Sequence, residues 1–245
     1  GILRLKGEVM LYVTGDTHGE WNRWNCLIDR YLSEGDMIFI CGDFGYIFDD
    51  NKAENRFLDE LEEKPYTILF VDGNHENHER LAAYPEESWA GGRIHRVRKN
   101  VIHLMRGQVY HIEEKRFFIM GGAYSIDRAM RIEGISWWPQ EMPSEAEYDE
   151  ARKNLAACNY QVDYILTHAA PEDTMSLFHP YHPDEVKLNF FLEWVRENTS
   201  YQHWYMGHLH QDRDMWRNQT ILWYELRKLE TGELVNGAEL YGDDL

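Results

Sequence analysis

The chain carries the stretch MLYVTGDTH at residues 10–18. Its first five residues are apolar or β-favouring and predict a strand that ends at Gly15. Asp16 and His18 follow at once, so a carboxylate and an imidazole leave the strand together. In α/β proteins, ligand sites are built at the carboxyl ends of parallel strands, because loops converge there. The stretch therefore predicts a strand whose end contributes to a site.

Four further strand-like runs end in the same kind of residue. They cover residues 37–41, 67–71, 162–167 and 204–206. The oxygen and imidazole side chains that follow them are Asp43, Asn74, His75, His168, His208 and His210. A single histidine after a strand is usually a turn or core residue, but five such strand ends together are hard to explain that way. We therefore expect these strand ends to form one site.

Segments with helical periodicity lie between most of these strands, and this alternation indicates an α/β fold. Apolar residues at three-to-four spacing predict helices at 20–33, 53–63, 145–157 and 186–198, and Ser144 with Glu147 forms a capping-box signature. From Gly91 the pattern changes to closely spaced strands at 92–97, 101–105, 109–112 and 116–120. We expect this middle segment to form an antiparallel or mixed second sheet, and a last strand to cover 220–226.

Length and composition are those of an ordinary globular enzyme. The chain has 245 residues, 43% hydrophobic and 14% aromatic, so one domain over residues 1–245 is expected. It begins with Gly1 rather than Met, and residues 1–7 are treated as partly derived from a tag. Its three cysteines show no metal-ligand spacing, and no run approaches the roughly 20 apolar residues of a membrane helix. These features predict a soluble, cytoplasmic protein.

The formal net charge of -18 bears on the partners of the protein. A strongly acidic surface repels phosphate polymers, so extended nucleic acid is not expected as a partner. The one basic cluster contains Arg93, Arg96, Arg98 and Lys99, with Arg106 close behind. A solvated strand face is favoured for this cluster over a substrate-binding patch.

The strand ends carry seven candidate metal ligands: Asp16, His18, Asp43, Asn74, His168, His208 and His210. Seven donors are too many for one tetrahedral zinc ion but fit two metal ions. A carboxylate can bridge two cations, so Asp16 or Asp43 would be shared, and the mixed oxygen and nitrogen donors suit Mn, Fe, Zn or Ni better than Ca. Two ions about 3.5 to 4 Å apart polarise a phosphoryl group and lower the pKa of a bridging water, which becomes the nucleophile.

The blocks DTHG (16–19), GD (42–43), GNHE (73–76), His168 and GHLH (207–210) follow one another over most of the chain. In these blocks the chain resembles the calcineurin-like metallophosphoesterases. The resemblance implies a two-sheet β-sandwich flanked by helices, in four αββα layers. It implies two divalent ions, with Mn favoured and Fe, Zn, Ni or Mg as alternatives. One ion would be held by Asp16, His18, Asp43 and His210, and the other by Asp43, Asn74, His168 and His208, with Asp43 as the bridge.

Other residues near the predicted ligands have expected roles as well. His75 would protonate the leaving oxygen or stabilise the transition state, in keeping with imidazole chemistry near neutral pH. Glu76 and Asp127 are considered as partners of the inner ligands, although other roles are favoured, and Asp72 is expected to cap a turn. His179 and His182 are expected on the surface or outside the ligand set. The aromatic stretch 128–143 is expected to be packing more than cleft wall.

One loop differs from the family pattern, and this difference narrows the range of expected substrates. Its Ser/Thr protein phosphatases carry an Asp-Arg-Gly after the bridging aspartate, whereas the loop here, residues 42–46, has no arginine. We therefore expect a phosphoesterase that hydrolyses a small phosphorylated or nucleotide substrate, a mono- or diester. A nuclease or cyclic nucleotide phosphodiesterase is the alternative, and a non-catalytic metal-bound scaffold for a protein partner is the alternative of another class. Substrate, native metal, oligomeric state and any role of Arg93, Arg96 or Arg106 stay open.

Overall fold

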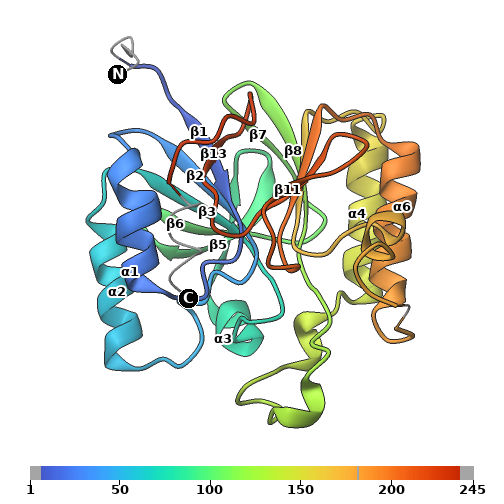
Figure 1. The fold of residues 1–245 in the computed structure, drawn as a ribbon, viewed down its shortest axis with the longest axis horizontal. Coiled ribbons are helices and arrows are strands. Elements are labelled where there is room, and N and C mark those ends of the chain that lie inside the picture. The colour runs from blue at the N-terminus through green and yellow to red at the C-terminus, as the bar shows by residue number, and fades with distance from the viewer. Residues whose placement is uncertain (1–6, 181, 238–245) are drawn as a thin grey trace.

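A computed structural model describes residues 7–180 and 182–237 and shows two β-sheets packed face to face (Figure 1). The first sheet has the order β13-β1-β2-β3-β6-β5-β4. Its strands are β1 (Leu11–Thr14), β2 (Met37–Cys41), β3 (Thr67–Val71), β4 (Glu86–Trp89), β5 (Gly92–Arg98), β6 (Val101–Leu104) and β13 (Arg227–Lys228). The central strands β1, β2, β3 and β6 run parallel, and the flanking strands pair antiparallel with their neighbours.

The second sheet repeats this plan in the order β11-β12-β10-β9-β8-β7. Its strands are β7 (Val109–Ile112), β8 (Lys115–Met120), β9 (Tyr164–Thr167), β10 (His203–Met206), β11 (Arg213–Asp214) and β12 (Gln219–Ile221). The four central strands are parallel and both edge strands are antiparallel. Each sheet therefore presents a row of parallel carboxyl ends.

Helices cover the outer face of each sheet (Figure 1). The first sheet is covered by α2 (Lys52–Glu62) and by a continuous helical stretch of α1 (Trp21–Arg23), the π-helical η1 (Trp24–Ile28) and the 3-10 turn η2 (Asp29–Tyr31). The second is covered by α4 (Glu145–Ala157) and α6 (Val186–Asn198). Short elements complete the chain: α3 (His78–Ala83), α5 (Glu172–Met175), η3 (Arg128–Met130) and η4 (Pro139–Glu141). No helix within the described ranges is long and apolar enough to cross a membrane.

Successive side chains of a strand point to opposite faces of the sheet, and they fill three apolar layers: one between the two sheets and one between each sheet and its helices. In β2, Ile38 and Ile40 face the helices of the first sheet, whereas Phe39 and Cys41 face the second sheet. Phe39 stacks on Phe117 of β8, with ring centroids 4.8 Å apart, between the two sheets. A strand buried on both faces needs apolar residues at every position, and this explains the continuous apolar runs in the sequence. The predicted four-layer αββα sandwich is confirmed.

The structure corrects the predicted division of strands between the sheets. The middle segment does not form a sheet of its own, because β5 and β6 join the first sheet and only β7 and β8 join the second. The strand expected at 220–226 covers only 219–221. The helix expected at 20–33 is helical over 21–31, with a change of helix type at Trp24. The capping box at Ser144 is present, with both of its hydrogen bonds.

Candidate metal centre

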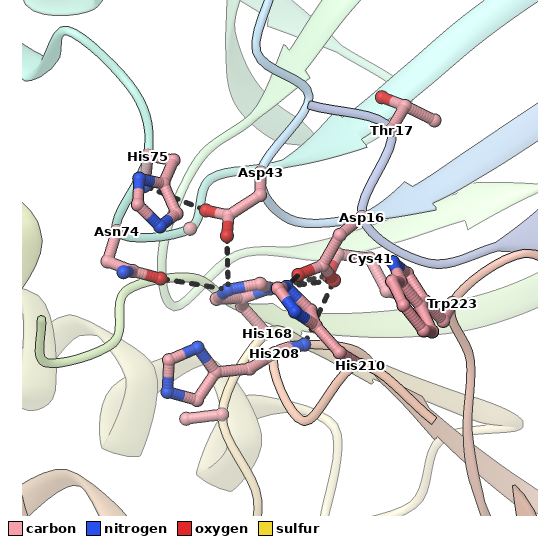
Figure 2. Close-up of polar contacts among 12 residues, drawn as sticks. Asp16, Thr17, Cys41, Asp43, Asn74, His75, His168, His208, His210 and Trp223 are labelled. Carbon is pink, nitrogen blue, oxygen red and sulfur yellow. Dashed lines mark hydrogen bonds and ion pairs between the residues drawn. The ribbon is translucent and has the colours of Figure 1, made fainter. Parts of the chain in front are cut away.

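The seven predicted ligands meet where the parallel strands of both sheets end. Asp16, His18 and His210 form one group, in which each residue offers a ligand atom within 4.8 Å of the others. A second group of the same kind contains Asp43, His168 and His208. The seventh residue, Asn74, places its Oδ1 3.1 Å from the Nε2 of His168 (Figure 2). The partition resembles the one implied by the family, and Asp43 lies between the groups, its Oδ2 3.9 Å from His18 Nε2.

The two aspartates share one arrangement. Asp16 Oδ1 accepts a hydrogen bond from the backbone N–H of His208 (2.9 Å), and Asp43 Oδ1 accepts one from the N–H of His75 (2.8 Å). Their Oδ2 atoms are buried and have no hydrogen-bond partner among the described residues. The nearest groups to these oxygens are imidazoles, with His210 Nε2 3.2 Å from Asp16 and His168 Nε2 3.2 Å from Asp43. Each carboxylate is thus fixed by one oxygen and aims the other into the site.

This donor set fits divalent metal ions. A buried carboxylate oxygen without a hydrogen bond is costly unless a cation or a hydrogen-bond donor satisfies it. His168 is oriented for ligation, because its Nδ1 bonds the carbonyl oxygen of Cys41 (2.7 Å), leaving Nε2 for the site. His210 is held by stacking on Trp223, with ring centroids 5.0 Å apart. Mixed carboxylate, amide and imidazole donors suit Mn, Fe or Zn.

Backbone geometry around the site is strained where the ligands sit. His18, Asp43, His208 and His210 have positive φ angles of 50°, 48°, 71° and 50°. This left-handed region is uncommon for residues other than glycine and concentrates at functional sites. Gly207 is required by crowding, since a Cβ there would lie 2.4 Å from the Oδ1 of Asp16. The loops are therefore shaped to bring the side chains together at some cost in backbone energy.

Neighbouring carboxylates change the pKa of His168 in the candidate metal centre. Burial lowers its pKa, but Asp43 and Asp16 raise it to about 10. Burial raises the pKa of Asp16, yet His168, His18 and His210 together hold it well below its usual range. Burial lowers the pKa of His208 to about 3. The raised pKa favours a protonated His168, and a cation bound by these residues would compete with that proton.

A chain of polar contacts fixes the Asn74 amide and was not foreseen from the sequence. Asn74 Nδ2 donates to Ser125 Oγ (3.0 Å), which in turn donates to the buried carboxylate of Glu141 (2.6 Å). Glu141 also pairs with Arg128 (2.7 Å). Because Ser125 binds the NH2 group, the amide oxygen of Asn74 is turned toward His168. No sequence motif marks Ser125 or Glu141, because the two residues are 16 positions apart and meet only in the folded chain.

His75, the predicted proton donor, lines a cavity of 370 Å³ together with ligands of the centre. Burial lowers its pKa, Asp43 raises it, and the positive charges of His18 and Arg131 lower it further. Asp127 and His179 also line this cavity, so His179 is an exposed residue next to the ligand groups, as the sequence suggested. Glu76 is buried and joins two loops, accepting hydrogen bonds from Gly73 N (2.6 Å) and Gly45 N (3.1 Å).

Other expectations are corrected by the contacts. Asp72 does not merely cap a turn, because its carboxylate pairs with Arg106 (2.8 Å) and His103 (2.8 Å) in the interior. Arg93 pairs with Glu86 and Glu150, and Arg96 pairs with Glu87. The three arginines considered as phosphate-binding groups are therefore each neutralised by carboxylates.

Both tryptophans of the aromatic stretch 128–143 pack against other side chains. Trp138 is buried and contacts Phe48, with ring centroids 5.6 Å apart. Trp137 packs instead on the guanidinium of Arg128 (4.3 Å). Packing therefore accounts for both tryptophans.

Comparison with known proteins assigns the family. Residues 10–212 match the family model described as calcineurin-like phosphoesterase. No curated protein shows a significant match. Among solved structures, the phosphopantetheinyl hydrolase PptH of Mycobacterium tuberculosis matches with 13% identity, a TM-score of 0.47 and coverage of 89% of each chain. The family match covers most of the chain and includes every predicted ligand, and the chain therefore belongs to the calcineurin-like phosphoesterase family.

Proposed function

We propose that the protein is a metal-dependent phosphoesterase that holds two divalent ions and hydrolyses a small phosphate mono- or diester. One observation carries the proposal: two buried aspartate oxygens without hydrogen-bond partners, Asp16 Oδ2 and Asp43 Oδ2, face two groups of imidazoles. Asp16, His18, Asp43 and His210 would hold one ion, and Asp43, Asn74, His168 and His208 the other. Such ions, Mn first among the candidates, polarise a phosphoryl group and lower the pKa of water.

The protein side chains supply the remaining steps. His75 lies in the same cavity as Asp43 and Asn74, so it is placed to exchange a proton with the leaving oxygen of a bound ester. Burial lowers the pKa of His75, which favours the neutral form of the free ring. An anionic phosphate group beside the ring raises that pKa again, because an opposite charge stabilises imidazolium. The ring can therefore gain its proton when substrate binds and donate it as the ester bond breaks.

Hydrolysis by reconstituted protein tests the proposal. Metal-stripped protein is reloaded separately with Mn, Fe, Zn, Ni or Mg and assayed on p-nitrophenyl phosphate and bis-p-nitrophenyl phosphate. Turnover that appears only with metal supports the proposal, and the ratio of the two rates gives the monoester or diester preference. Protein that binds two ions and hydrolyses neither ester with any metal would contradict it.

The variant His75→Ala separates the proton donor from the ligands. We expect it to retain both metal ions and to lose about 10²- to 10⁴-fold in kcat, because general acid catalysis contributes that much. His111→Ala is the matched control, since His111 lies on β7 and outside both ligand groups. Metal content is measured by elemental analysis. Loss of metal from His75→Ala would show that the residue is a ligand instead.

A further inference from the structure

The segment 126–137, called here the arm, exposes an unusual amount of apolar surface. Eight large hydrophobic side chains are exposed among the described residues, and four of them lie in the arm: Ile126 (71% exposed), Met130 (89%), Ile132 (62%) and Ile135 (65%). Figure 1 shows this yellow-green segment projecting away from the sheets, near α3. Single exposed apolar residues need no explanation, but a cluster of them commonly marks a binding surface.

The arm is held in place by specific contacts. The guanidinium of Arg128 lies 4.2 Å from the ring centroid of Tyr124 and 4.3 Å from that of Trp137. The same group pairs with Glu141, which is fully buried. Arg131 pairs with Asp127 (2.7 Å). These contacts hold the arm in one conformation in which its apolar side chains are exposed to solvent.

The apolar surface begins inside the cavity of the metal centre. Ile126 and Asp127 line the same 370 Å³ cavity as Asn74 and His75. Met175 also lines this cavity, and Leu177, two residues further along the chain, is 56% exposed. A molecule whose phosphate reached the metal ligands would thus meet apolar side chains where it leaves the cavity.

We propose that the arm binds an apolar group of the substrate, so that the preferred ester is amphiphilic, with its phosphate at the metal centre and a hydrocarbon group on the arm. This inference rests on the proposed phosphoesterase function and names its substrate class. Arg128 and Arg131 are neutralised by Glu141 and Asp127, and the remaining charge of the arm is the exposed carboxylate of Glu133, so the arm offers no unpaired cation to a polar or anionic leaving group. Apolar contact remains its main source of binding free energy.

Two other occupants fit the arm less well. The formal net charge of -18 repels an anionic lipid surface, which disfavours docking on a membrane of that kind. A second copy of the chain on the arm would cover the rim of the cavity that substrate must enter. The substrate group is therefore the occupant that agrees with both the charge and the position of the arm.

Two homologous ester series test the inference with the metal-loaded protein. The first series runs from phenyl phosphate to 4-octylphenyl phosphate, and the second from methyl to octyl 4-nitrophenyl phosphate. All esters are used below their critical micelle concentrations. We expect kcat/KM to rise at least about tenfold along the series that the enzyme hydrolyses, mostly through KM. The triple variant Met130→Ser, Ile132→Ser and Ile135→Ser is expected to abolish this rise and to leave p-nitrophenyl phosphate hydrolysis unchanged. Phe190→Ser on α6, also an exposed apolar residue, is the control and keeps the rise.

The possible outcomes are distinct. No hydrolysis of any ester refutes the proposed function itself. Hydrolysis that is independent of chain length, or a rise that the triple variant retains, overturns the inference while the function stands. A dimer that the triple variant converts to monomer, seen by light scattering, assigns the arm to a second copy. Binding of wild-type but not triple-variant protein to zwitterionic phosphatidylcholine vesicles, without a chain-length effect, assigns it to a membrane.

Discussion

Two buried clusters of charged residues lie beside the end of β3 and differ in one respect. In the metal centre, Asp16 and Asp43 each leave one buried oxygen without a hydrogen-bond partner. In the second cluster, both oxygens of Asp72 are satisfied, one by His103 and the other by Arg106. Both clusters are buried, and burial alone does not tell them apart. Unsatisfied oxygens that face imidazoles indicate a binding site, whereas satisfied oxygens indicate an internal ion pair.

The pKa values reflect the same difference. In the candidate metal centre Asp43 and Asp16 raise the pKa of His168, and a bound cation would compete with the proton on this ring. For Asp72, burial raises the pKa, but Arg106 and His103 hold it far below its usual range. Arg106 cannot release its proton, so that pair is permanent. A cation bound at the candidate metal centre would replace an exchangeable proton, whereas the Asp72 cluster already contains the permanent cation of Arg106.

The largest predicted effect comes from Asp43→Asn. Asp43 lies between the two ligand groups, so the variant is expected to lose metal binding and hydrolysis together. Its thermal stability without metal should also fall, because the buried pair between Asp43 and protonated His168 is lost. Metal content, turnover and Tm of the metal-free protein are measured side by side, with Asp149→Asn on the surface of α4 as the control. Full activity in Asp43→Asn would remove the distinction between the two clusters.

The converse is predicted for Asp72→Asn. Removing this charge leaves Glu147 as the one carboxylate paired with Arg106 among the described residues, and breaking a buried pair costs about 3 kcal/mol or more. We expect a loss of that size in the free energy of unfolding, with two metal ions still bound per folded chain. Urea unfolding gives the stability, and elemental analysis gives the metal content. A stable variant that has lost its metal would instead make Asp72 part of the metal centre.

A smaller effect is predicted for Ser125→Ala. Without the hydroxyl, the amide of Asn74 is free to rotate away from His168, and loss of such an outer contact typically weakens metal binding about tenfold or more. The loss should fall on one of the two ions, because Asn74 is assigned to one group. Titration with metal monitored by calorimetry tests this, with Ser176→Ala as an exposed control. Equal weakening of both ions would contradict the partition.

The sequence was sufficient to predict which residues meet at the candidate metal centre, but not the difference between the two clusters. Asp43 and Asp72 both follow apolar strands, and nothing local separates a ligand from an ion-pair partner. The partners of Asp72 lie 31 and 34 residues further along, on or just after β6. Ser125 and Glu141 escaped prediction for the same reason, since their roles depend on contacts between loops. The strand ends were predictable because they depend only on local pattern.

The division of strands between the sheets shows a similar limit. Short strands with polar turns correctly indicated antiparallel pairs, and β5 with β6 and β7 with β8 are such pairs. The chain passes from the first sheet to the second between β6 and β7, within a four-residue connection. Hairpin patterns carry no information about that crossing, which is decided by packing between Phe39 and Phe117 and their neighbours in the layer between the sheets.

The last prediction is a pH dependence of stability that only the metal-free protein shows. The pKa of His168 is about 10 in the folded chain, above the ordinary value of 6.5. Protonated His168 therefore stabilises the metal-free fold fully below pH 6.5, and this stabilisation is lost as the pH rises toward 10. We expect the Tm of chelator-treated protein to fall between about pH 6.5 and 9, by about 2 to 4 °C for each kcal/mol lost. Metal-loaded protein should not show this fall, because its His168 is already deprotonated, and Asp43→Asn should weaken it, since Asp43 raises the pKa. An equal fall with and without metal would place the titrating group outside the metal centre.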